Sequence, residues 1–188
     1  MVKISYSTVV AVSIMVVVVV AIGFFVYGNT FDKPADGPEK SGMTVTDMEG
    51  RTVTLNAPVE RIVLMESSKT AELAAIVGDG FAEKIVGWDN DIKQNAGDEY
   101  AVFVAKYPQL ADIPDVGSLD DGTFSIEKVI SLEPDVVIMH NWQFTWAGDA
   151  TADALTKLEL AGIPVVFVDF YMDPMVNSTK SMLLLGKI

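Results

Sequence analysis

The chain has 188 residues, half of them apolar, and 26 acidic against 13 basic side chains give it a formal net charge of −13 at pH 7. A surface this acidic repels nucleic acid and anionic lipid, so no nucleic-acid partner is expected. The lack of cysteine excludes disulfides and thiolate metal sites, and a single histidine, His140, excludes a multi-histidine metal site. We therefore expect no cofactor and no protein-bound metal. The acidity is typical of a solvated surface, and attraction of a cationic ligand is the alternative.

An apolar run occupies residues 8–27, interrupted only by Ser13 and Gly23. As a helix, its twenty residues would span about 30 Å, the thickness of a bilayer core. The run exceeds the roughly 7–15 apolar residues of a signal peptide and has no small-x-small cleavage site. This favours an uncleaved transmembrane anchor at residues 1–28, with a cleaved signal as the alternative. Lys3 before the run and Asp32 after it indicate a cell-membrane protein whose soluble part lies on the extracytoplasmic side.

A polar segment rich in Pro and Gly follows at residues 29–42 and predicts a flexible linker. Alternating Thr and Val then flank a turn ending at Gly50, which predicts a β-hairpin over residues 43–55.

The rest of the chain alternates short apolar runs with helical patterns. The expected strands are 61–65, 84–88, 135–139 and 164–168, and the expected helices are 67–77, 100–106, 126–132, 151–161 and one from 178 onward. Ser67 or Ser68 is expected to cap the first helix and Gly78 to end it, while Ser125 is expected to cap the third. This order predicts an α/β fold, with a Rossmann-like, mostly parallel sheet and helices on both faces.

In such a sheet, ligands bind at the edge where the strands end. The loops expected at that edge are 66–69, 88–91, 140–146 and 169–173. They carry the aromatic residues Trp88, Trp142, Phe144, Trp146 and Tyr171. These rings either pack beneath their loops or form a ligand wall, and their shared edge slightly favours the wall. For His140, a hydrogen-bonded loop position is the alternative to ligand contact.

Enzyme motifs are not found. The Gly78-Asp-Gly80 segment follows a helix rather than a strand, and Glu83 stands where a dinucleotide fingerprint needs its third glycine. The sequence contains neither a Walker A loop nor a G-x-S-x-G elbow. We therefore do not expect an enzyme.

Several segments, in the same order, resemble the periplasmic substrate-binding proteins of ABC importers for iron complexes, siderophores and cobalamin. They are VTDMEGRTVTL at 45–55, PVERIV at 58–63, KIVGW at 84–88, VGS at 116–118, EKVISLEPDVVI at 127–138, LELAGIPVV at 158–166 and LLLGKI at 183–188. Each segment is a weak signal alone, and their common order makes the resemblance specific.

The resemblance implies a two-lobed protein that holds its ligand between lobes joined by a helix. This chain would supply only the N-terminal lobe, at residues 43–176, and the start of the connecting helix, at 177–188. Carried over to this sequence, the ligand contacts are Ser67, Ser68, Trp88, Gly117, Ser118, His140, Asn141, Trp142 and Tyr171. The implied ligand is an iron chelate or related complex, such as a siderophore, haem or a cobalamin-like molecule. The implied partners are an ABC permease and its ATPase. A membrane-anchored sensor or adhesion ectodomain built on the same lobe is the alternative.

Overall fold

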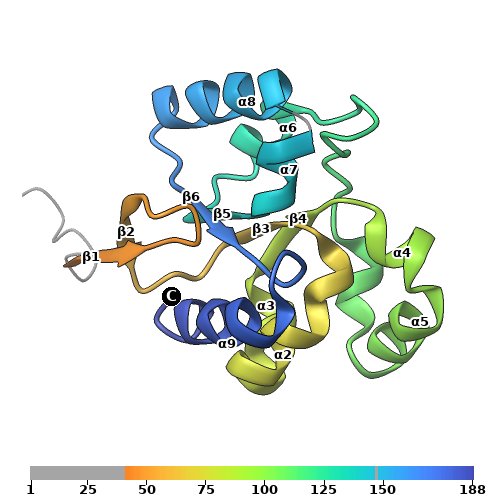
Figure 1. Cartoon of the computed structure of the whole chain (residues 1–188). Helices are drawn as coiled ribbons and strands as arrows, with labels where there is room; N and C mark the ends of the chain where they lie inside the picture. The colour runs from red at the N-terminus through yellow and green to blue at the C-terminus, as the bar shows by residue number, and fades with distance from the viewer. Residues whose placement is uncertain (1–40, 147) are drawn as a thin grey trace, which may run out of the picture. The chain divides into compact units, whose positions relative to one another are not determined.

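The parallel sheet expected from the apolar strands is present in a computed structural model of the chain, which describes residues 41–146 and 148–188 (Figure 1). The strands are β1 (Ser41–Thr46), β2 (Thr52–Ala57), β3 (Ile62–Met65), β4 (Ile85–Trp88), β5 (Val136–His140) and β6 (Val165–Val168). The α-helices are α2 (Thr70–Val77), α3 (Phe81–Lys84), α4 (Asp91–Asn95), α5 (Gly97–Lys106), α6 (Ile126–Ser131), α7 (Asn141–Trp146), α8 (Gly148–Leu160) and α9 (Pro174–Leu185). Three 3₁₀ turns are η1 (Ser67–Lys69), η2 (Gly78–Gly80) and η3 (Pro108–Asp112).

The expected anchor at residues 1–28 and nearly all of the expected linker lie outside the described residues. Among the helices that the structure describes, none is long and apolar enough to cross a membrane. Strand β1 begins at Ser41, two residues before the expected start of the hairpin.

The main sheet has the strand order β4-β3-β5-β6, and all its neighbouring strands run parallel. Helices α2, α3 and α9 cover one face, and α6, α7 and α8 cover the other (Figure 1). The predicted fold class is therefore confirmed for the described residues.

Alternation along the strands builds a core on each face of the sheet. Within β3, Ile62 and Leu64 join one cluster of buried residues, while Val63 and Met65 join the other. All four residues are buried, as expected for a parallel sheet covered on both sides.

The antiparallel hairpin packs against the edge strand β6. The backbone N–H of Met48 donates to the Phe167 carbonyl at 3.0 Å, and Arg51 Nη2 donates to the Val165 carbonyl at 2.8 Å. The Asp47 carboxylate accepts two hydrogen bonds from the Arg51 guanidinium, at 2.9 and 2.7 Å. The hairpin thus occupies hydrogen-bonding groups that an edge strand would otherwise expose.

Three local predictions need correction. Neither Ser67 nor Ser68 caps α2, because the chain first forms η1 and neither flanking position makes a side-chain capping bond. The segment after β5, expected as a loop, is helix α7. Helix α9 begins at Pro174 rather than near residue 178, because proline is well suited to the first turn of a helix.

Other local predictions are confirmed. Ser125 caps α6 by accepting a hydrogen bond from the Lys128 backbone N–H at 3.3 Å. Gly78 ends α2 with a φ of 74°, a conformation that glycine adopts without strain.

Candidate functional site

The connections of the sheet place a crevice between the ends of β3 and β5. From β3 the chain continues to β4 on one side of the sheet, whereas from β5 it continues to β6 on the other side. The loops that leave these two adjacent strands therefore diverge, and ligands in open α/β sheets bind where such a divergence occurs.

An open cavity of about 1200 Å³ lies at this edge. Loops from all four strands contribute to it, together with the segment that leads into α6. Its lining residues are Glu66, Ser68, Lys69, Asp89, Asn90, Asp91, Gln94, Asn95, Ala96, Glu99, Asp115, Val116, Gly117, Ser118, Asp120, Asp121, Thr123, Ser125, Lys128, Trp142, Trp146, Tyr171 and Met172.

Carboxylates dominate the charge of the cavity. The seven acidic side chains are Glu66, Asp89, Asp91, Glu99, Asp115, Asp120 and Asp121, and the two basic ones are Lys69 and Lys128. Both lysines already have partners in the protein. Lys69 Nζ lies 4.7 Å from the centre of the Tyr171 ring, and Lys128 Nζ donates to the Asp115 carbonyl. The cavity therefore presents a net negative wall to a ligand.

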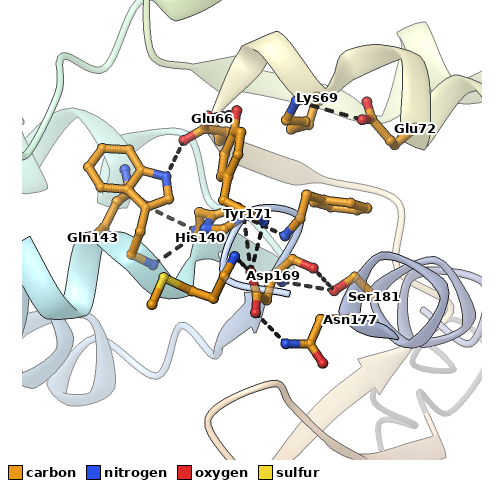
Figure 2. Close-up of polar contacts among 12 residues, drawn as sticks. Glu66, Lys69, Glu72, His140, Gln143, Asp169, Tyr171, Asn177 and Ser181 are labelled. Atoms are coloured by element: carbon orange, nitrogen blue, oxygen red, sulfur yellow. Dashed lines mark hydrogen bonds and ion pairs between the residues drawn. The ribbon is translucent and has the colours of Figure 1, made fainter. Parts of the chain in front are cut away.

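Glu66 joins the loops that follow three of the strands (Figure 2). Its carboxylate accepts from Trp142 Nε1 at 2.9 Å, from the Tyr171 hydroxyl at 2.8 Å and from Ser68 Oγ at 3.2 Å. Burial raises the pKa of Glu66 above its usual value, and the hydrogen bonds from Tyr171 and Trp142 counteract part of that rise. The carboxylate thus fixes two aromatic rings of the cavity wall.

The loop after β6 is held by Asp169 (Figure 2). Its carboxylate accepts from the backbone N–H groups of Tyr171 and Met172, each at 2.9 Å, and from Asn177 Nδ2 at 2.6 Å. Ser181 Oγ donates to the Asp169 carbonyl at 2.8 Å. Helix α9 therefore helps to place Tyr171 at the cavity.

His140 is the last residue of β5 and is fully buried. The backbone N–H of Phe170 donates to its Nε2 at 2.7 Å. Burial lowers the pKa of His140 to about 4, so the ring is neutral at pH 7. His140 connects β5 to the loop after β6 and does not reach the cavity wall. Of the two interpretations of His140, the structure favours the hydrogen-bonded position over ligand contact, although the residue ends strand β5 rather than standing in a loop.

Ser67 and Asp89 connect the loops after β3 and β4. The backbone N–H and the hydroxyl of Ser67 donate to Asp89 Oδ1 at 2.9 and 2.6 Å, and the Asp91 backbone N–H reaches the same atom at 3.2 Å. Ser67 Oγ also accepts from the Ile92 backbone N–H at 2.9 Å. Burial raises the pKa of Asp89 to about 7, despite the hydrogen bonds from Ser67 that lower it. Ser67 is thus internal, whereas Asp89 lines the cavity.

Gly117 shapes the wall through its backbone. Its φ is 79°, and a Cβ added there would lie 2.2 Å from the Thr123 carbonyl oxygen. Its backbone N–H donates to Asp115 Oδ1 at 2.8 Å, and the Ser118 N–H donates to Thr123 Oγ1 at 3.0 Å. Only glycine fits this tight loop without displacing the backbone.

The structure divides the nine expected ligand contacts into two groups. Five of them line the cavity, namely Ser68, Gly117, Ser118, Trp142 and Tyr171. Four do not, namely Ser67, Trp88, His140 and Asn141. Trp88 lies in the core, where its ring meets the Tyr100 ring edge-on at 6.1 Å. Direct ligand contact is therefore not proposed for these four.

Sequence reasoning missed several residues of the wall. Glu66, Lys69 and Asp89 belong to loops that were expected at this edge, but no sequence signal distinguished their side chains. Asp120 and Asp121 belong to a turn that carried no motif. Trp146 was identified only as one of a group of aromatic residues. It is 80% exposed and lies one helical turn from Trp142 on the same face of α7.

Comparisons with known proteins agree with this architecture. No protein-family model matches the chain. A curated relative from Bacillus subtilis, the uncharacterized ABC transporter substrate-binding lipoprotein YvrC, is 30% identical over 127 residues, which are 68% of this chain and 33% of the relative. The crystal structure of the TroA-like periplasmic binding protein FepB from Veillonella parvula matches 77% of this chain and 42% of its own, with a TM-score of 0.70 and 33% identity. A periplasmic solute-binding protein from Veillonella parvula matches 78% of this chain and 41% of its own, with a TM-score of 0.58 and 24% identity, and shows the fold alone.

The sheet, its crevice and the open cavity have the architecture of one lobe of a solute-binding protein. The chain belongs to the TroA-like periplasmic substrate-binding proteins of ABC importers, the family that the ordered sequence segments resemble. These relatives are binding proteins rather than enzymes. The chain spans less than half the length of each of them.

Proposed function

We propose that the chain is the extracytoplasmic solute-binding component of an ABC importer. It binds an iron chelate or a related metal complex, such as a siderophore, haem or a cobalamin-like molecule, and delivers this ligand to a permease and its ATPase. The observation that carries the proposal is the open cavity of about 1200 Å³ at the divergence of β3 and β5, in a chain of this family. Residues 1–28 are its proposed anchor, 29–42 its linker and 43–176 its binding lobe. Residues 177–188 are proposed as the start of an inter-lobe helix.

The cavity favours a chelated metal over a bare ion. Among the residues that the structure describes, no group of three or more His, Cys, Asp or Glu side chains is placed to hold a metal ion. The cavity volume exceeds the roughly 300–1000 Å³ of a typical small-molecule pocket. A large ligand whose metal is already coordinated fits both observations. Ser68, Gly117, Ser118, Trp142 and Tyr171 are its proposed contacts.

The negative wall favours a neutral or cationic complex. Binding an anion here would bring like charges together, whereas a ligand ammonium group would find carboxylates and aromatic faces. The full chain is therefore expected to bind a ferric trihydroxamate with one free ammonium group about fivefold more tightly than its N-acetylated form, since one exposed charge pair contributes at most about 1 kcal/mol. A ferric tris-catecholate, a trianion, is expected to bind most weakly. Titration monitored by tryptophan fluorescence measures all three affinities.

A matched pair of variants tests the source of this preference. Asp120→Asn removes a carboxylate from the wall, whereas Asp149→Asn removes an exposed one on α8 that does not line the cavity. Only Asp120→Asn should reduce the ratio between the two trihydroxamates. Tighter binding of the catecholate would contradict the charge preference, and failure of all three complexes to bind would contradict the metal-complex class.

A further inference from the structure

Glu66 has a backbone conformation that is unfavourable for glutamate. It follows β3 with a φ of 149° and a ψ of 63°, in a region that favours glycine. Residues held in such conformations often occur at ligand clamps, where the surrounding structure compensates for the strain. Glu66 stands at the N-cap position of η1, yet its side chain makes no capping bond. Helix capping therefore does not explain why a glutamate occupies this position.

The Glu66 carboxylate is also buried outside any described ion pair, with the Lys69 ammonium attracting it only at longer range. The residue is 7% exposed, and it forms no ion pair among the described residues. A buried carboxylate that forms no ion pair destabilises a fold relative to an apolar residue of similar size, even when it accepts hydrogen bonds. The stability of the fold alone therefore does not explain why a glutamate occupies this position. The explanation lies in the side chains that donate hydrogen bonds to its carboxylate.

Those groups are two aromatic rings of the cavity wall. The indole of Trp142 and the hydroxyl of Tyr171 each have one polar hydrogen, and both donate it to Glu66. His140 and Lys69 further restrict the Tyr171 ring, with the imidazole centroid 4.6 Å from the ring centroid and Nζ 4.7 Å from it (Figure 2). The hydrogen bonds to Glu66 thus complete a set of contacts that fixes the orientation of both rings.

We propose that Glu66 is a positioning residue that orders the Trp142 and Tyr171 rings before a ligand arrives. Ordering a binding surface in advance reduces the entropy lost on binding, which strengthens affinity without any new contact. The ligand part of this inference rests on the proposed function. The ordering of the rings can be measured in the ligand-free chain.

Two variants of Glu66 separate positioning from a general structural role. Glu66→Gln keeps the side-chain volume but has only one oxygen, so it cannot accept from Trp142 and Tyr171 on separate oxygens. Glu66→Gly removes the carboxylate and relieves the backbone conformation, so it should fold at least as stably as the wild type while the rings lose their partner. Glu83→Gln, which removes an exposed carboxylate of α3, is the matched control.

The first measurement is the indole N–H signal of Trp142 in the full chain labelled with ¹⁵N-tryptophan, assigned with Trp142→Phe. In Glu66→Gln and Glu66→Gly, this signal alone should shift and its hydrogen exchange should accelerate about tenfold or more, as expected for loss of a hydrogen bond to a charged acceptor. The Trp88 and Trp146 signals should not change. Urea unfolding should show Glu66→Gly to be no less stable than the wild type.

An unchanged Trp142 signal would overturn the inference. A concerted change of all three indole signals, with loss of stability in Glu66→Gly, would overturn it as well, because Glu66 would then support the whole fold. The second measurement is the affinity for the ferric trihydroxamate with a free ammonium group, expected to fall about tenfold in both Glu66 variants and not in Glu83→Gln. If the wild type binds no chelate while the indole result holds, the proposed function fails and the positioning of the rings stands.

Discussion

Replacing Trp88 by alanine is expected to lower the free energy of unfolding by about 3–5 kcal/mol, the cost of deleting a large buried aromatic side chain. The Trp88 side chain is fully buried in the cluster that also contains Leu64 and Phe81. Its ring packs edge-on against Tyr100. Urea unfolding at neutral pH measures the change.

Trp146→Ala is the matched control. Its ring is 80% exposed at the cavity, so the same substitution there should change the free energy of unfolding by no more than about 0.5 kcal/mol. If Trp88→Ala were as stable as the wild type and lost only ligand affinity, the assignment of Trp88 to the core would be wrong.

Trp88 illustrates what a sequence pattern leaves undetermined. The apolar run at 84–88 correctly predicted a strand, and that strand ends at the edge of the sheet where the cavity lies. Whether its last side chain points to the core or to the cavity depends on the register with β3. In the structure, Trp88 pairs with Leu64 and packs in the same buried cluster as that residue. Register is determined by pairing between strands that are distant in sequence, so a single strand does not reveal it.

The elements predicted correctly from sequence are those with strong local patterns. The alternating Thr and Val of the hairpin, the apolar strands and the serine before α6 each indicate one structure through local chemistry. Helix α7 lacked such a pattern, because its aromatic residues and its threonine are only moderate helix formers. Hydrogen bonds to the strand before it and the helix after it stabilise it instead. The His140 N–H donates to Gln143 Oε1 at 3.1 Å, and Thr151 Oγ1 donates to the Gln143 carbonyl at 2.8 Å.

The polar side chains of the candidate site were the least predictable. Glu66 and Asp89 resemble ordinary loop carboxylates in sequence. Their importance follows from burial and from contacts with residues 76 and 22 positions away, respectively. The resemblance placed the expected contacts on loops that border the cavity, but two of those residues, His140 and Ser67, connect the loops from the interior. The structure thus distinguishes residues that line the cavity from residues that hold the wall in place.

Asp89→Asn is expected to stabilise the chain at neutral and higher pH by about 4 kcal/mol, with little change near pH 4. Burial raises the pKa of Asp89 to about 7 in the folded state, against about 3.9 in the unfolded state. Between these values the folded state holds a proton that the unfolded state has lost. The free energy of unfolding of the wild type therefore falls as pH rises from about 4 to 7, by about 1.4 kcal/mol for each unit of difference in pKa.

Asparagine should keep the local structure, because all three hydrogen bonds from Ser67 and Asp91 to the Asp89 carboxylate reach Oδ1, and an amide oxygen can accept all three. His140 acts in the opposite direction. Its pKa of about 4 in the folded state makes stability fall as pH drops below about 6.5. That contribution is common to wild type and variant, so it cancels in their difference.

Urea unfolding of both proteins between pH 4 and 8 therefore isolates Asp89. The difference in free energy of unfolding should rise across this range and level off above pH 7, and the exposed control Asp149→Asn should show no such rise. A flat difference would mean that Asp89 ionises as readily in the folded chain as in the unfolded one. If the rise is observed, wild-type Asp89 is partly protonated near neutral pH, and the negative charge of the cavity wall then increases with pH. The preference for cationic over neutral complexes should strengthen over the same pH range, and it should lose this pH dependence in Asp89→Asn.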